Sequence, residues 1–161
     1  LVDAARIMLN RFPATKFYVA GREANLRWNE IYRKTERLSI SDSFVYSGYV
    51  SDVFSFMDKM DIGVIASVGS EAISRAALEW MASGKALVAS RTGCLGEIIE
   101  NHVSGFLYEP GDYMKLAEHL VMLGCERSKI AKIGRSAEER VKKHFSFDMF
   151  IANTEKIYNA F

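Results

Sequence analysis

The sequence of 161 residues contains little glycine and proline and has almost no net charge. Its 11 glycines and 2 prolines are too few for a low-complexity or collagen-like chain. Its 21 basic and 20 acidic residues leave a formal charge of +1, so the main electrostatic argument for binding duplex nucleic acid or an anionic membrane is missing. We therefore expect no nucleic-acid partner.

Cysteine and long apolar runs are also scarce. Cys94 and Cys125 are far apart, with no CxxC motif, which argues against a disulfide scaffold or a structural zinc site and favours the reducing cytoplasm. Apolar runs such as residues 62–66 are much shorter than the ~20 residues of a membrane span. The chain opens at Leu1, without Met, in an expected helix that reaches Phe12, so we expect a fragment of a longer protein.

Three short motifs of common enzyme classes are absent. The loop after the first expected strand lacks GxGxxG, and the chain has neither GxxxxGK[ST] nor GxSxG. These absences argue against a dinucleotide fingerprint, a standard P-loop and a nucleophile elbow. His102, His119 and His144 are scattered along the chain and are expected on the surface.

The hydrophobic pattern, in contrast, is informative. Short apolar runs alternate with longer amphipathic segments, as in βαβ proteins with a parallel sheet. The expected strands are residues 16–20, 43–46, 62–66, 86–90 and 105–108. The expected helices between them are about 22–39, 51–59, 72–83 and 95–101. Since ligands bind beyond the carboxyl ends of such strands, the loops of interest follow Ala20, Tyr46, Ala66 and Ser90.

Only helices are expected after the last strand. Asp112 can cap the first of them, which Gly124 would close, and Ser146 can cap the last, whose apolar stripe runs from Phe147 to Phe161. No repeat or linker interrupts the chain, so residues 1–161 form one expected domain.

Two glutamates suggest a binding site: Glu71, just before the helix expected over residues 72–83, and Glu79, eight residues on within that helix. A buried carboxylate at Glu79 needs hydrogen-bond donors, which a sugar diol supplies, and the free amides of residues 72–75 suit a phosphate. Glu71 stands where a helix favours an acid. The alternative is that Glu71 is only a helix cap and Glu79 only a partner of Arg75, four residues earlier.

Several segments resemble the group 1 (family 4) glycosyltransferases. Glu71 and Glu79, followed by Trp-Met-Ala-Ser-Gly, resemble the Glu-x7-Glu region of that family. Residues 45–52, 93–97 and 101–112 resemble its other segments in the same order, so the likeness covers nearly the whole chain.

The resemblance implies a GT-B fold. This chain would be its C-terminal, donor-binding domain, a Rossmann-like parallel sheet flanked by helices with its first strand missing. The acceptor-binding N-terminal domain and the catalytic residues would lie outside the chain. The enzyme would transfer a hexose from a UDP- or GDP-sugar to a glycan, lipid or other acceptor, with retention of configuration and without a metal or cofactor, in polysaccharide biosynthesis. It would be cytoplasmic, and any contact with the inner face of the membrane would come through the other domain.

The resemblance also implies roles for individual residues. Glu79 would bind the ribose, Glu71 the transferred sugar, and the amides of Ile73, Ser74 and Arg75 the diphosphate. The segment Gly48-Tyr49-Val50 would lie against the base, bordered by Gly21 and Arg22. The last helix would pack across the interdomain region, so Phe150 and Tyr158 should be partly exposed in this chain.

The chain departs from the family pattern in two places. Ala72-Ile73-Ser74 stands where the family has Gly-Phe-Gly, and Gly96 replaces a proline, so the pocket for the donor sugar differs. Arg75 adds a cation that could face phosphate or pair with Glu79. Two other functions remain open: a nucleotide-sugar-binding module without turnover, and another GT-B enzyme such as a sugar-nucleotide epimerase.

Overall fold

The computed structural model describes residues 1–23, 27–69 and 72–159, which form five strands and eight α-helices. The strands are β1 (Phe17–Ala20), β2 (Phe44–Gly48), β3 (Ile62–Ile65), β4 (Ala86–Ser90) and β5 (Phe106–Tyr108). The helices are α1 (Val2–Arg11), α2 (Trp28–Arg37), α3 (Val53–Asp58), α4 (Arg75–Ala82), α5 (Leu95–Ile98), α6 (Tyr113–Cys125), α7 (Arg127–His144) and α8 (Phe147–Tyr158). All five expected strands are confirmed within two residues at each end.

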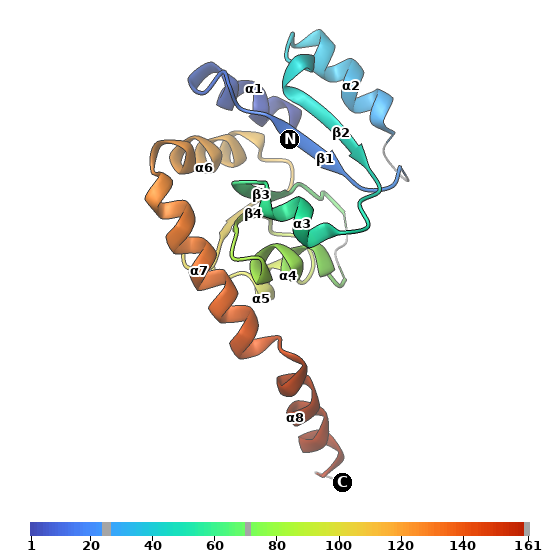
Figure 1. Cartoon of the computed structure of the whole chain (residues 1–161), viewed down its shortest axis with the longest axis vertical. Helices are drawn as coiled ribbons and strands as arrows, with labels where there is room; N and C mark the ends of the chain where they lie inside the picture. The colour runs from blue at the N-terminus through green and yellow to red at the C-terminus, as the bar shows by residue number, and fades with distance from the viewer. Residues whose placement is uncertain (24–26, 70–71, 160–161) are drawn as a thin grey trace.

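The five strands form two parallel sheets rather than the single sheet that the sequence suggested. β1 pairs with β2, and β4 lies between β3 and β5 (Figure 1). Between β1 and β3 lies a groove of ≈ 770 Å³, lined by Val19, Val64, Trp80, Leu120 and other mostly apolar side chains. The order β2-β1, groove, β3-β4-β5 matches the doubly wound order 3-2-1-4-5-6 with the place of strand 1, between strands 2 and 4, vacant. We expect the missing strand that the family resemblance implies to pair in this groove.

Two clusters of apolar side chains cover β4 and β5 on opposite faces. Alternate residues of a strand point to opposite faces, so Val88 packs with α1 and α6, whereas Leu87 packs with α4, α5 and α7. β4 is buried along its whole length. A third cluster covers one face of β1 and β2 with α1 and α2.

The predicted N-caps of two C-terminal helices are confirmed. The carboxylate of Asp112 accepts a hydrogen bond from the Lys115 amide at 2.9 Å, and the Ser146 hydroxyl accepts one from the Met149 amide at 3.3 Å. The prediction that Gly124 closes α6 is wrong, because the helix continues to Cys125. A Cβ at Gly124 would lie 2.7 Å from the Phe12 ring, so close packing against α1 explains this glycine.

Two further predictions differ in outcome. His119 was expected on the surface, but it is buried between α6 and β5, 4.9 Å from the Phe106 ring. Phe150 and Tyr158 in α8 are 66% and 77% exposed, as expected, and this helix extends away from both sheets (Figure 1). In the described part of the chain, no helix has the length and apolar character needed to span a membrane.

Candidate functional site

The carboxyl ends of β1 and β2 bring two predicted site segments together. The Gly21 amide donates to the Gly48 carbonyl at 2.8 Å, and the Tyr46 hydroxyl donates to the Gly21 carbonyl at 3.1 Å. Gly48 has φ +61°, a left-handed conformation that glycine adopts without strain. These contacts fix the two loops side by side at the sheet edge.

An exposed cation–π pair caps these loops. The Arg22 guanidinium lies 4.5 Å from the centre of the Tyr49 ring, and this ring is exposed to solvent. Val50 follows, half-buried, in the loop that leads to α3. The structure therefore gathers four of the five residues predicted to border a base: Gly21, Arg22, Gly48 and Tyr49.

The helix predicted to start at Ala72 begins three residues later. Ala72 and Ile73 form an exposed bend, and buried Ser74 is the residue before the first helical position, Arg75. The free amides of the first helical turn are therefore those of residues 75–77, while the amides of 72–74 belong to the bend. Ile73 is 80% exposed because it precedes the first helical turn.

Arg75 and Glu79 form an ion pair on the first turns of α4. The distance from Nη2 of Arg75 to Oε1 of Glu79 is 3.2 Å, and the two side chains are 85% and 24% exposed. An exposed pair of this spacing contributes about 0.3–0.5 kcal/mol, so it separates at little cost. Within the described chain, no hydrogen bond reaches Oε2 of Glu79.

Glu71, the other predicted acid, lies outside the described residues. Its predicted role is therefore left to experiment. The described residues on either side, Gly69 after β3 and Ala72 before α4, are both exposed.

Two buried hydroxyl residues at the end of β4 were not predicted to belong to the site. Ser90 is fully buried and Thr92 nearly so, and their hydroxyl oxygens are 3.1 Å apart. The Thr92 hydroxyl donates to the Ser67 carbonyl, in the loop after β3, at 3.2 Å. The sequence signal that could have identified them is a pair of hydroxyl residues at the carboxyl end of an otherwise apolar strand.

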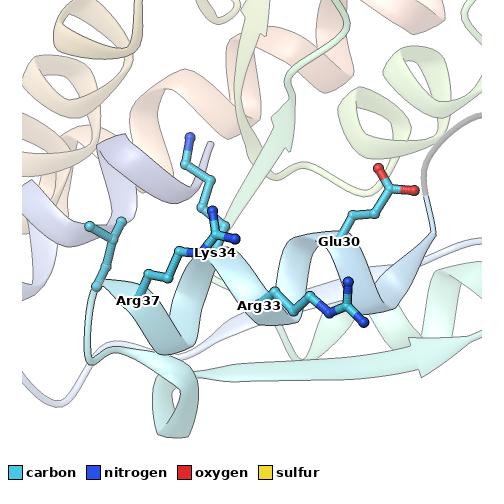
Figure 2. A pocket seen from close by; sticks show the side chains of 5 residues that line it. Glu30, Arg33, Lys34 and Arg37 are labelled. Atoms are coloured by element: carbon cyan, nitrogen blue, oxygen red, sulfur yellow. The ribbon is translucent and has the colours of Figure 1, made fainter.

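A second hollow lies away from this edge, on α2. It is lined by Glu30, Arg33, Lys34, Arg37 and Leu38. Figure 2 shows the four charged side chains extending from this one helix. Lys34 pairs with Asp3 of α1, and the Leu38 carbonyl accepts a hydrogen bond from Arg6, so parts of this surface serve the contact between α1 and α2. In the described ranges, no three His, Cys, Asp or Glu side chains are placed to hold a metal ion.

Comparison with known proteins identifies a family. The family model described as glycosyl transferases group 1 matches residues 1–124. N-acetyl-alpha-D-glucosaminyl L-malate synthase from Bacillus anthracis is 26% identical over 128 residues, 80% of this chain and 33% of that protein. The chain spans about two-fifths or less of the length of the curated relatives that it matches.

Solved structures share the fold. HepE from Anabaena, in complex with UDP, superposes with a TM-score of 0.91 at 22% identity, over 100% of this chain and 44% of that one. The C-terminal domain of LpcC, a group 1 glycosyl transferase from Francisella tularensis, gives a TM-score of 0.81 at 26% identity, over 91% of this chain and 77% of that one. The architecture is that of a GT-B C-terminal domain.

Proposed function

The chain belongs to the group 1 glycosyltransferases, and from this premise we propose that it is the donor-binding domain of an enzyme that transfers a hexose from a UDP- or GDP-sugar with retention of configuration. The acceptor is a glycan or lipid held by an N-terminal domain outside this chain, which also supplies the catalytic residues. The binding of UDP by HepE, which has the same fold, supports a nucleotide donor. The observation that carries the proposal is the Glu79 carboxylate of α4, which is 24% exposed and has only the exposed Arg75 as its partner among the described residues.

Glu79 binds the ribose in this proposal. A carboxylate accepts two charge-assisted hydrogen bonds, which match the two vicinal hydroxyls of a ribose. Glu79 uses Oε1 for Arg75 and is shielded from most of the solvent, so hydroxyl donors can replace a weak surface pair with two stronger bonds.

The diphosphate lies at the start of α4. Ala72, Ile73, Ser74 and Arg75 supply backbone amides in the bend and at the first helical position, where the helix dipole favours an anion. The Arg75 side chain is 85% exposed, so it can turn from Glu79 toward phosphate without being pulled out of a packed site. When the donor binds, the ribose would contact Glu79 and the phosphate would contact Arg75, so the ion pair between these two residues would be replaced by contacts of each with the ligand.

The base lies against the segment of Gly48, Tyr49 and Val50. The exposed Tyr49 ring offers an aromatic surface for stacking. The Arg22 guanidinium already makes a cation–π contact with this ring. Gly21 and Gly48, joined by a hydrogen bond, keep the neighbouring backbone without side chains. These features support a base of either size, uracil or guanine.

The remaining roles follow the family. Glu71 contacts the transferred sugar. The nucleotide sugar is a substrate and not a cofactor, and, as in the family, no metal takes part. We place the enzyme in the cytoplasm, with membrane contact only through its other domain.

The test is the substitution Glu79→Gln in the full-length protein. Glutamine keeps the size and helix propensity but loses the charge and one acceptor oxygen, so stability changes little. Affinity for the donor should fall by roughly one to three decades. Calorimetric titration with UDP- and GDP-sugars, and a melting curve on the same sample, measure the two effects separately.

Glu138→Gln is the matched control. Glu138 pairs with Lys142 four residues on, in α7, at a comparable partial exposure. If Glu79 is only a structural partner of Arg75, both variants will lose a few tenths of a kcal/mol and bind the donor like the wild type. That result would refute the ribose role of Glu79.

A further inference from the structure

We infer that Thr92 is a positioning residue for the diphosphate-binding segment: its hydroxyl, oriented by Ser90, holds the loop between β3 and α4 at the sheet edge. This inference rests on the proposed function. It concerns two residues that lie outside the predicted site and are nevertheless buried beside it.

The first step is the direction of the hydrogen bonds. The Thr92 hydroxyl has one hydrogen, which it donates to the Ser67 carbonyl at 3.2 Å. In the 3.1 Å contact between the two hydroxyls, Ser90 must therefore be the donor and Thr92 the acceptor. The result is a directed relay from Ser90 through Thr92 to the backbone of the loop.

The second step is the place where this relay acts. β3 and β4 remain paired up to Ile65 and Ala89, whereas the next residue of β4, Ser90, pairs with β5 alone. The chain after Ile65 thus leaves the sheet just where the hydroxyl relay begins. Beyond the last paired residues of β3 and β4, the Thr92 side chain makes one more hydrogen bond between the two segments, in place of a backbone–backbone bond.

The third step is the rigidity of the anchor. The Thr92 amide donates to the Ser90 carbonyl at 2.8 Å, and the Thr92 carbonyl accepts from the Leu95 amide, which starts α5, at 3.2 Å. Thr92 is thereby fixed to the fully buried strand β4 and to a helix. At the other end of the hydrogen bond, the loop is half-buried at Ser67 and exposed at Val68 and Gly69.

The fourth step is the consequence for binding. The loop held at Ser67 leads within a few residues to the bend at Ala72 and to Arg75, whose amides bind phosphate in the proposed function. If the loop drifts, these amides have to be ordered when the ligand binds, and that ordering lowers affinity. Thr92 would act on the ligand through the loop and would not touch it.

The experiment compares Thr92→Val with Thr92→Ser in the full-length protein. Valine keeps the shape but removes the hydroxyl, while serine keeps the hydroxyl and loses only a methyl group. Ser104→Ala is the control, because Ser104 is equally buried and its Oγ accepts from the Glu100 amide at 2.9 Å, before β5 and away from this loop.

Two measurements are made on each variant. Hydrogen exchange at residues 66–69 reports the loop without any ligand, and calorimetric titration with UDP and GDP reports binding. For Thr92→Val we expect exchange about tenfold faster in this loop and nucleotide affinity about tenfold weaker. Thr92→Ser should restore both to near the wild-type values, and Ser104→Ala should lower the melting temperature and change neither.

The outcomes distinguish the positioning role of Thr92 from the proposed function of the domain. If Thr92→Val lowers stability but leaves exchange in this loop as it is in Ser104→Ala, the positioning role is wrong. If exchange rises but affinity does not, the relay holds the loop without serving the ligand, which also overturns the inference. If the wild type binds neither UDP nor GDP, the proposed function fails, whereas the exchange data still decide whether the relay holds the loop. If Thr92→Val does not fold, Ser90→Ala takes its place, with the same two measurements.

Discussion

The two sheets of this domain differ in how they are covered. The sheet of β3, β4 and β5 lies between α1 and α6 on one face and α4, α5 and α7 on the other, and every residue of β4 and β5 is buried. The sheet of β1 and β2 is covered by α1 and α2 on one face, and Tyr18 and Val45 remain exposed. The first sheet is a buried base for α4 and Thr92, and in the proposed function the loop after β2 presents the exposed Tyr49 ring to the base. In this proposal the domain separates stability from recognition.

The largest expected effect tests this separation by core deletion. Leu87→Ala in fully buried β4 leaves a cavity and should lower the free energy of unfolding by about 2–5 kcal/mol. Val45→Ala in β2, where the side chain is 39% exposed, should cost less than about 1 kcal/mol. Urea unfolding of both variants measures the contrast, and equal losses would show that the two sheets are equally buried in solution.

The next test concerns the groove between the two sheets. β1 and β3 line a groove of ≈ 770 Å³. This groove lies where strand 1 of the doubly wound order would pair between them. A strand from polypeptide that precedes Leu1 in the full-length protein would pair with both edges. Hydrogen exchange at residues 17–20 and 62–65 should then be at least about tenfold slower in the full-length protein than in residues 1–161 alone.

Two results would contradict the filled groove. If hydrogen exchange at both strand edges is equally fast in the full-length protein and in residues 1–161, no strand fills the groove. Protection in residues 1–161 that rises with protein concentration would instead assign the groove to a second copy of the chain. Peptides from β4 are the internal control, because this strand is paired on both sides and should exchange slowly in both samples.

The smallest effect tests the covering of the three-stranded sheet by α6. His119 is 3% exposed, and its Nε2 has no hydrogen-bond partner among the described residues. Burial lowers the pKa of His119 below its usual value of 6.5. The charges of Lys115 and His102 lower this pKa further, whereas the charge of Glu118 raises it. The unfolded chain therefore binds the proton more readily than the folded chain as the pH falls below 6.5, so acid destabilises the fold.

The expected slope is modest. Between pH 6.5 and the lower pKa of the folded state, the stability due to His119 falls with decreasing pH by at most about 1.4 kcal/mol per pH unit. His119→Leu should lose this part of the slope, whereas exposed His144→Gln should keep it. Thermal unfolding from pH 7 to pH 5 checks both variants, and identical slopes in wild type and His119→Leu would contradict the burial of a neutral histidine.

The sequence predicted local features well because their causes lie within a few residues. Five apolar runs gave the five strands, and the caps at Asp112 and Ser146 followed from a side-chain oxygen placed before a helix. The family resemblance implied that Gly21 and Gly48 border one base, and the structure joins them by a hydrogen bond. The start of α4 was predicted too early, since Ala72 and Ile73 are compatible with a helix but are held in a bend.

By itself, the sequence determined the order of strands and helices and the strand ends that carry the candidate site, because hydrophobic periodicity and helix and strand end signals depend on consecutive residues. Only the tertiary structure decided how far β1 and β3 are apart, that Gly124 makes room for Phe12, and that His119 is buried. It also decided that a hydroxyl relay connects Ser90 through Thr92 to the loop at Ser67. Each of these depends on segments distant in the chain packing together, and a local pattern carries no information about the distance between them.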